Sequence, residues 1–347
     1  MSENMEKAVA EVKSALPGMT LLENEPMALH SSFKIGGPVR AVCYPSSVFA
    51  ASKICAILKQ NHLFPMIIGN CTNVLFPDGA LDVFIICTEK LNKVIVNGDG
   101  TIYAECGVSL ARLAGVAQQN GLAGLEFASG IPGTLGGGIR MNAGAYGGEM
   151  KDVIDSVVYY FLPDQGLYEV KNADCNFAYR KSIFQTQPAV IFSAVLSLRD
   201  GDKDEIAAKM RELNEKRRSK QPLDLPSAGS AFRRPEGYYA AALIEECGLK
   251  GYRVGGAQVS EKHAGFVVNT GGATAKDVYD LMMHVRNTVA KEKNVFMEPE
   301  IIMLPPDADM TDNSPPAPKT IVTTPEGLGT AMEADAVIAA ELMKDTE

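Results

Sequence analysis

The chain lacks any apolar run of the roughly 20 residues that a membrane-spanning helix requires. Its first residues, MSENMEKAVAEV, mix charges among the apolar positions, so we expect no secretory signal peptide. The seven cysteines are scattered and contain no Cys-x-x-Cys pair, which disfavours a disulfide framework or a zinc site. Neither His30 nor His263 has a partner at metal-binding spacing, so we predict no metal. These absences indicate a cytoplasmic protein with reduced thiols.

The common nucleotide-binding motifs are also missing. Gly-x-Gly-x-x-Gly and Gly-x-x-x-x-Gly-Lys-Ser/Thr do not occur, which disfavours a Rossmann or P-loop fold. The 33 basic and 42 acidic side chains give a net charge of −9, whereas a nucleic-acid-binding protein needs a positive surface. Nine acidic residues and only two lysines lie in 306–347, however, so the rest of the chain carries −2. The exclusion of nucleic acid therefore depends on the missing motifs, and the nearly neutral body is compatible with a basic pocket for phosphates.

The periodicity of apolar residues predicts both helices and strands. Residues 40–87 read as strand, helix and strand, which predicts a parallel pair joined by the helix. Residues 88–200 contain a hairpin signal at 98–100 and predict an antiparallel sheet. The helices that we expect span 3–16, 46–61, 109–120, 202–220, 238–247 and 275–292, the last with Thr274 as its N-cap, and the strands span 63–68, 82–87, 93–97, 101–105, 153–161, 167–171, 189–198, 264–268 and 299–304.

The length of 347 residues suggests two or three domains, and the apolar fraction of 46% excludes a wholly disordered chain. We expect domains at 1–87, 88–200 and 201–304. Residues 305–347 are acidic and rich in proline, so we expect a disordered tail with one short helix.

Two loops have the composition of phosphate-binding segments. Ile68-Gly69-Asn70-Cys71-Thr72-Asn73 follows directly after a predicted strand, and residues 130–148 read GIPGTLGGGIRMNAGAYGG. Glycine lets backbone amides approach a diphosphate closely, and successive amides form a nest for an anion. Tight turns in a β-rich domain are the alternative explanation. The glycine content of 130–148 exceeds what turns require, so we favour binding.

These loops occur with other segments in an order that resembles the UDP-N-acetylenolpyruvoylglucosamine reductase (MurB) family, flavoproteins of peptidoglycan precursor synthesis. The matching segments are SSFKIGGP at 31–38, the loop at 68–75, GIPGTLGGGIRMNAGAYGGE at 130–149, YRKSIF at 179–184, PSAGSAFRRPEG at 226–237, GGAQVSEKHAGFVVN at 255–269 and EPE at 298–300. A series of this length is far more specific than any one motif.

The resemblance implies an α+β fold. Two α+β subdomains of the vanillyl-alcohol-oxidase type would hold FAD non-covalently, and a C-terminal α+β domain would bind the substrate. The implied reaction is the NADPH-dependent reduction of the enolpyruvyl ether of UDP-N-acetylglucosamine to UDP-N-acetylmuramate, with hydride passing through FAD. We expect a monomer whose partners are these small molecules, with no nucleic acid and no membrane span.

Three residues match the catalytic positions of the family. Negative charge develops on the enolpyruvyl carboxylate during reduction, and Arg180 would stabilise it with its planar guanidinium. Glu300 would work with Arg180, and Glu298 is its competitor at a spacing of two on the same strand. Ser230 would donate a proton to the α-carbon, which is reasonable only where its geometry is fixed.

The resemblance also predicts binding residues. FAD would contact Gly69, Asn70, Cys71, Thr72, Asn73, Gly133, Gly136, Gly137, Asn142, Gly144, Ala145 and Gly147. The substrate would contact Tyr179, Arg234, Lys262 and His263, each of which could equally be structural.

The chain departs from the family pattern in two places. Cys71-Thr72 replaces Gly-Ser, and a side chain at Cys71 is costly if the backbone needs a positive φ, which would weaken flavin binding. The stretch 181–229 contains no tyrosine, so the chain resembles the subtype without the tyrosine-bearing insertion, and the substrate cap would be Tyr238, Tyr239 or Tyr252.

Two other functions remain open at this point. An oxidase of the same flavin fold would share both loops but would not need the three catalytic residues together. A non-catalytic nucleotide-binding protein would have lost flavin through Cys71. The three candidate catalytic residues favour the reductase.

Overall fold

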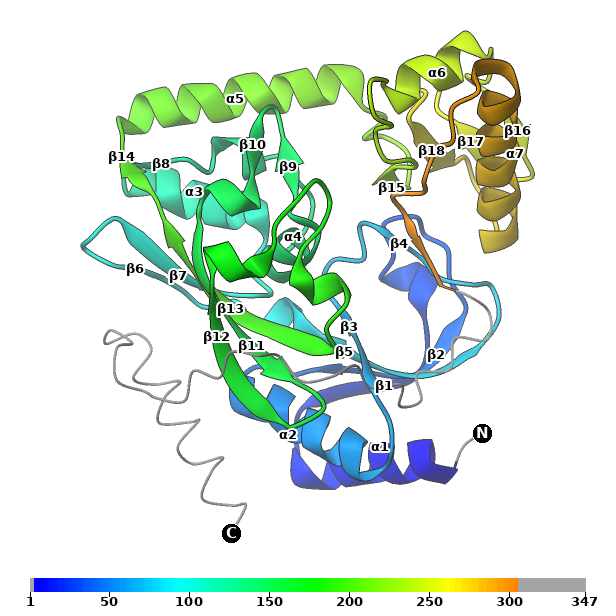
Figure 1. Ribbon diagram of the computed structural model, residues 1–347. Coiled ribbons are helices and arrows are strands. Elements are labelled where there is room, and N and C mark those ends of the chain that lie inside the picture. The colour runs from blue at the N-terminus through cyan, green and yellow to red at the C-terminus, as the bar shows by residue number, and fades with distance from the viewer. Residues whose placement is uncertain (1–2, 305–347) are drawn as a thin grey trace.

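The computed structural model describes residues 3–304, and the predicted tail at 305–347 lies outside them. The first sheet has the strand order β1 (Thr20–Pro26), β2 (Pro38–Tyr44), β5 (Leu81–Cys87) and β3 (Pro65–Ile68). Strand β1 is antiparallel to β2, and the other neighbours are parallel. Helices α1 (Glu3–Ala15) and α2 (Val48–Gln60) cover one face of this sheet (Figure 1).

The predicted helix α2 and its parallel strands are confirmed, with Ser47 as the N-cap of α2. The predicted direct pairing of the two strands that α2 joins is wrong, because β5 lies between them. The reason is burial. Every residue from Val83 to Cys87 is buried, and a strand covered on both faces belongs at the centre of a parallel sheet.

The second sheet is antiparallel throughout, as predicted. Its strand order is β12 (Gly166–Lys171), β11 (Ile154–Phe161), β13 (Ala189–Ser197), β7 (Thr101–Glu105) and β6 (Val94–Val96). The hairpin expected at 98–100 joins β6 to β7. Helix α3 (Leu110–Gln119) begins at its N-cap Ser109, and one apolar core continues from this sheet to α1 and α2.

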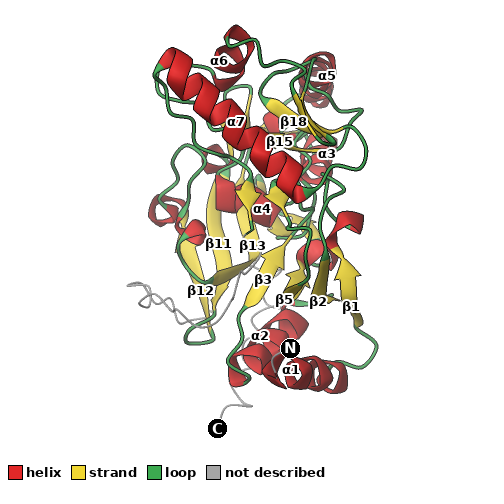
Figure 2. Ribbon diagram, turned by 90° about the vertical axis from the view of Figure 1, so that its right-hand side faces the viewer, coloured by secondary structure: helices red, strands yellow, loops and turns green. Residues whose placement is uncertain are grey.

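The third part of the chain begins after the long helix α5 (Lys203–Lys220), which runs along the top of Figure 1. Its sheet has the order β15 (Ser227–Ser230), β18 (Phe266–Asn269), β17 (Ala257–Val259) and β16 (Arg253–Val254). Helices α6 (Ala240–Glu246) and α7 (Ala275–Lys293) pack against it (Figure 2). The predicted N-cap Thr274 is confirmed, and it forms a capping box with Asp277.

The first and third parts of the chain share a core. Phe33, Ile35 and Leu75 pack in the same apolar cluster as Leu281 and Val285 of α7. The strand expected at 299–304 shortens to β19 (Ile302–Met303), which pairs in parallel with β4 (Val74–Leu75). A domain bounded at residue 201 therefore depends on residues from the beginning of the chain to complete its interior.

The remaining elements are short. They are β8 (Leu122–Ala123), which pairs with β14 (Arg199–Asp200), α4 (Leu135–Met141), β9 (Gly144–Ala145), β10 (Gly148–Glu149), and the 3₁₀ turns at Met27–Leu29, Thr88–Lys90, Glu126–Ala128, Met150–Asp152, Asn172–Cys175 and Ile183–Gln185. Within residues 3–304, no helix combines the length and apolar character needed to cross a membrane.

Replacing Asp78 by alanine is expected to destabilise the fold by about 1 kcal/mol, since its carboxylate caps α7 from the first part of the chain. One oxygen accepts from the Ala275 N–H at 2.7 Å and the other from Lys276 N–H at 3.2 Å. Urea unfolding measures the change. The control is Asp280→Ala, which removes only an exposed pair with Lys276 and should cost about 0.5 kcal/mol or less. Equal midpoints for Asp78→Ala and the unmodified chain would contradict the capping role.

Candidate active site

The loop after β3 presents a row of unused backbone donors. Within the described residues, the N–H groups of Asn70, Cys71, Thr72 and Asn73 have no hydrogen-bond acceptor. Cys71 has a φ of 47°, the left-handed conformation that turns successive N–H groups toward one side. Consecutive N–H groups without protein acceptors form a site for an anion. This loop, residues 70–73, is called the amide nest below.

The glycine-rich segment lies directly against the amide nest. A Cβ on Gly69 would collide with Thr134 Oγ1 and lie 3.0 Å from its Cγ2, and a Cβ on Gly133 would lie 3.8 Å from Thr72 Oγ1. The Asn70 side chain donates to the Pro132 carbonyl at 3.3 Å. The two predicted phosphate loops are therefore brought together, with glycine at the point of closest approach.

The positive φ predicted to be costly at Cys71 is present. Its side chain is buried in the core of the first sheet, away from the amide donors, and burial raises its pKa to about 12. The thiol therefore stays protonated at neutral pH. A non-glycine residue in this conformation stores strain, but its side chain packs in the core, and the N–H groups of the loop keep no protein acceptor within the described residues.

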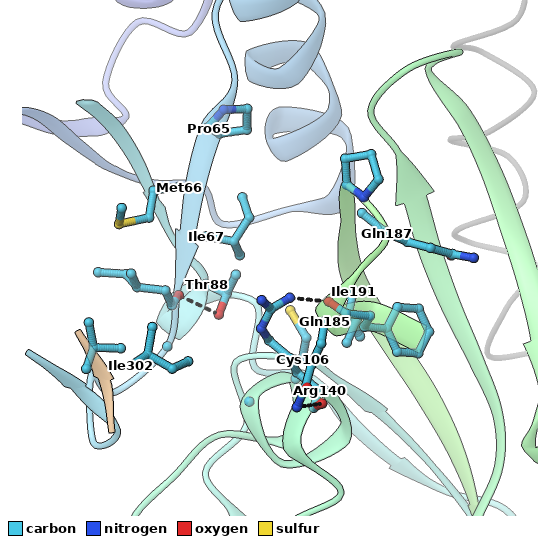
Figure 3. Close-up of a pocket in the computed structure, with 18 of the residues that line it drawn as sticks. Pro65, Met66, Ile67, Thr88, Cys106, Arg140, Gln185, Gln187, Ile191 and Ile302 are labelled. Atoms are coloured by element: carbon cyan, nitrogen blue, oxygen red, sulfur yellow. Dashed lines mark hydrogen bonds between the residues drawn. The ribbon is translucent and has the colours of Figure 1, made fainter. Parts of the chain in front are cut away.

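A cavity of about 580 Å³ opens beside the two loops (Figure 3). Its wall includes Gly69, Thr134 and Gly137 from the loops. The opposite walls come from β3, which is apolar, and from the segment that leads into β13, which alternates apolar residues with Gln185, Thr186 and Gln187. An apolar cavity that borders an anion nest suits the adenosine diphosphate half of a dinucleotide. The residues present thus fit the cofactor that the resemblance predicts.

Arg180 occupies a strained position in a tight turn. Ala178 and Lys181 exchange two backbone hydrogen bonds of 3.0 Å, and Arg180, between them, has a φ of 54°. Gln185 Nε2 donates to the Arg180 carbonyl at 2.8 Å and fixes the turn from one side. A non-glycine residue held with positive φ is characteristic of functional sites.

The side chains of Arg180 and Glu300 meet although they are 120 residues apart. Arg180 Nε donates to Glu300 Oε1 at 2.6 Å, and the two side chains are 22% and 13% exposed. Arg180 Nη2 also donates to the Gly144 carbonyl at 3.4 Å. Glu298, the predicted competitor, is 75% exposed and pairs with Arg233 at 3.3 Å. The geometry favours Glu300 over Glu298 as the partner of Arg180.

Ser230 lies beside this pair at the end of β15. The next residue, Ala231, accepts a hydrogen bond from the Glu300 N–H at 2.9 Å, so the segments that carry Ser230 and Glu300 are neighbours. The Ser230 hydroxyl has no protein partner in the described part of the chain. Its O–H is therefore free to donate to a bound molecule.

Asn142, predicted to contact FAD, has its side-chain hydrogen bonds within the protein. Its side chain is fully buried, donates to Glu149 Oε2 at 2.6 Å and to the Ala178 carbonyl at 3.0 Å, and accepts from Lys151 N–H at 2.9 Å. This arrangement favours a structural role in supporting the Arg180 turn over direct contact with a cofactor.

Gly144, Ala145 and Gly147 belong to the hairpin that joins β9 to β10. A Cβ on Gly144 would lie 2.7 Å from the Gly148 carbonyl oxygen, and Gly147 has a φ of 91°. The turn explains both glycines, as the alternative interpretation proposed. The hairpin also places the Gly144 carbonyl against Arg180.

Of the four predicted substrate residues, two are directly linked. The Tyr179 hydroxyl accepts from the Arg234 N–H at 3.2 Å, and the guanidinium of Arg234 lies over the Tyr239 ring at 4.0 Å. Lys262 instead donates to the Arg218 carbonyl at 2.7 Å, at the end of α5. His263 accepts from the Gly265 N–H at 3.1 Å, and burial lowers its pKa, so its ring is neutral at pH 7. These contacts favour structural roles for Lys262 and His263.

Arg140 and Gln185 line the cavity and are not among the residues predicted from the sequence. Arg140 could have been noticed, because it is the one charged residue in the stretch 130–148. Gln185 carries no such signal, since its role depends on the folded turn. The described residues contain no cluster of three or more side chains suited to a metal ion.

Two family models match the chain. Residues 39–164 match an FAD binding domain, and residues 221–304 match the C-terminal domain of UDP-N-acetylenolpyruvoylglucosamine reductase. The enzyme of that name from Caldanaerobacter subterraneus subsp. tengcongensis is 46% identical over 84% of this chain and 96% of its own. Its namesake from Pediococcus pentosaceus is 42% identical over 86% and 97%. The crystal structure of the Thermus caldophilus UDP-N-acetylenolpyruvylglucosamine reductase has a TM-score of 0.70 at 29% identity and covers 83% of this chain and 99% of that one.

Substituting Gly69 with alanine is expected to lower the free energy of unfolding by about 1–3 kcal/mol, because the new methyl group would force Thr134 away from the amide nest. The matched control is Gly79→Ala, where an added Cβ meets nothing within 4 Å and the change should stay within about 0.5 kcal/mol. Urea unfolding of both variants measures the difference. If the two variants have the same midpoint, the close approach of the two loops is not as described.

Proposed function

Because this chain belongs to the UDP-N-acetylenolpyruvoylglucosamine reductase family, we propose that the Arg180–Glu300 pair and Ser230 form its catalytic centre and that the amide nest holds its cofactor. The observation that carries the proposal is the 2.6 Å contact between Arg180 and Glu300. The end of β15, which carries the Ser230 hydroxyl, is the neighbour of the Glu300 segment.

The protein is an FAD-dependent oxidoreductase that reduces the enolpyruvyl ether of UDP-N-acetylglucosamine to UDP-N-acetylmuramate with NADPH, in peptidoglycan precursor synthesis. The predicted α+β fold, with an FAD-binding fold of the vanillyl-alcohol-oxidase type and a C-terminal α+β domain, is confirmed, as are FAD and NADPH. Its partners are small molecules. We propose in addition a cytoplasmic monomer whose domains divide near residues 88 and 201.

FAD is held, in this proposal, by the amide nest and by the facing residues Gly133, Gly136 and Gly137. When bound, FAD supplies the hydride that it takes from NADPH. The diphosphate would accept hydrogen bonds from the unpaired N–H groups of 70–73, and the adenosine would fill the apolar cavity. Asn73 connects this loop to the catalytic centre, since its side chain donates to the Glu300 carbonyl at 3.2 Å.

Arg180 is placed to bind the carboxylate of the enolpyruvyl group. Glu300 engages Nε, and among residues 3–304 the one further hydrogen bond of the guanidinium is the long contact with Gly144. Its outer edge therefore remains available for an anion. A fixed cation at the carboxylate stabilises the negative charge that develops as the double bond is reduced. Glu300 fixes the orientation of the guanidinium and would, in this proposal, lie beside the carbon that is reduced.

Ser230 is placed to deliver the proton that completes the reduction at the α-carbon. Its O–H is not used by the protein, and β15 holds it one residue from the backbone bond to Glu300. A serine is a weak acid, but the carbanion-like carbon is a strong base, so proton transfer requires only that the hydroxyl be correctly positioned.

Tyr179 and Arg234 form the substrate-facing edge of the site. The hydrogen bond between them joins the Arg180 turn to the third part of the chain. Of the three tyrosines proposed as a cap, Tyr239 has the strongest support, because its exposed ring already stacks on Arg234. Tyr252 stacks instead on His284, with ring centroids 4.3 Å apart.

The experiment that tests the function follows the colour of the flavin. The purified protein should be yellow, lose its colour with NADPH, and regain it anaerobically when the UDP-linked enolpyruvyl sugar is added. Rapid recolouring by oxygen alone would favour the oxidase. A colourless protein unable to take up FAD would favour the non-catalytic binding protein.

Replacing Ser230 by alanine should separate the two halves of the reaction. NADPH should still bleach the flavin at the normal rate, whereas reoxidation by the sugar nucleotide should slow by about a hundredfold or more, because the proton donor is lost. Anaerobic stopped-flow absorbance measures each half. Ser227→Ala, at the other end of β15, is the control and should behave as the unmodified chain. Normal reoxidation in Ser230→Ala would remove the proton-donor role.

A further inference from the structure

Arg140 is the one charged side chain among the described residues that line the 580 Å³ cavity. The other lining residues are apolar or uncharged polar. No carboxylate approaches Arg140 to within ion-pair distance in the described part of the chain. The cavity therefore contains a cation without a protein counter-charge.

The position of Arg140 on α4 directs its side chain to the phosphate-binding side of the cavity. Gly136 and Gly137 precede it by four and three residues, so all three lie on one face of the helix. Figure 3 shows Arg140 reaching between the wall that carries Ile67 and Thr88 and the wall that carries Gln185 and Ile191. Gly137 lines the same cavity, together with Gly69 and Val74, the residues on either side of the amide nest.

Most of the hydrogen-bonding capacity of Arg140 is unused. Its guanidinium donates to the Phe184 carbonyl, its only side-chain hydrogen bond among residues 3–304. A guanidinium has five N–H donors in a planar fork that matches two phosphate oxygens. The remaining donors are available to a molecule that enters the cavity.

The surroundings of Arg140 favour an anionic ligand. Its side chain is exposed within the cavity, yet the protein around it is close enough that burial lowers the pKa of the guanidinium from its usual value. A charge that is partly removed from water without a counter-charge is destabilising. Binding of an anion beside it would recover that free energy.

We propose that Arg140 binds the diphosphate of FAD from the adenosine side and makes this site selective for FAD over flavins that lack the adenosine diphosphate half. The inference rests on the proposed function, which supplies FAD as the occupant. The amide nest would contact the same diphosphate through backbone donors, and Arg140 would provide the side-chain cation.

The test measures binding to the full-length chain after its flavin has been removed. FAD, ADP and riboflavin are titrated into the unmodified protein and into Arg140→Gln, with flavin fluorescence and calorimetry as readouts. Loss of a charge-assisted bidentate contact in Arg140→Gln should weaken the binding of FAD and ADP by about ten- to a hundredfold. Riboflavin, which has no phosphate, should bind equally to both proteins. Arg140→Lys should lose less affinity for FAD and ADP than Arg140→Gln, since lysine keeps the charge but not the planar fork of donors.

The matched control is Arg112→Gln. Arg112 also donates to a backbone carbonyl, that of Asn92 at 2.7 Å, but lies outside the cavity, so its loss should leave all three affinities unchanged. Unaltered FAD binding in Arg140→Gln would overturn the inference. Equal weakening of FAD, ADP and riboflavin would also overturn it, because Arg140 would then only hold the Phe184 segment.

Two further measurements keep the test decisive. If Arg140→Gln does not fold, as judged by circular dichroism, the inference still requires that salt weaken ADP binding to the unmodified chain more steeply than riboflavin binding. Equal salt dependence would contradict it. An unmodified chain that takes up no FAD would instead contradict the proposed function.

Discussion

The Arg180–Glu300 ion pair is the interaction on which the rest of the site depends. It joins a turn of the second sheet to the segment that precedes the last strand, and both side chains are largely withdrawn from water. Such a pair is stable only where neighbouring groups satisfy the remaining donors and acceptors. The turn that carries Arg180 is hydrogen-bonded to Gly144, Gln185 and Asn142. The backbone of Glu300 is hydrogen-bonded to Ala231 and Asn73.

In the proposed function, the same contacts connect cofactor binding to catalysis. Asn73 belongs to the amide nest and bonds to the backbone of Glu300, whereas Asn142 follows α4 and bonds to the turn that carries Arg180. Each of the two predicted phosphate-binding loops therefore holds the segment of one partner of the ion pair. Because these loops are also in contact with each other through Gly69 and Thr134, the position of the cofactor and the geometry of the reacting residues are fixed by one packed unit.

The first and third parts of the chain are held together by groups that look unremarkable in the sequence. Ser32 donates to the carbonyls of Cys71 and Ser227 at 3.1 and 2.7 Å, and Asn269 donates to Phe33 at 3.0 Å. Asp78 caps α7 across the same boundary. These bonds place Ser230 beside Glu300, and they explain why the segment at 31–38 belongs to the functional part of the chain.

The sequence by itself determined the helices and the cap at Thr274, because apolar periodicity and capping depend on residues within a few positions of each other. It also identified the family, predicted two phosphate-binding loops, and indicated that a positive φ at Cys71 would be costly. Only the tertiary structure decided that β5 lies between β2 and β3, that Glu300 rather than Glu298 faces Arg180, and that Asn142 supports a turn. The proposed role of Arg140 also depends on the tertiary structure, since the absence of a counter-charge around it among the described residues is a property of the folded cavity. These features depend on contacts between residues far apart in the chain, which packing and burial establish and local patterns do not encode.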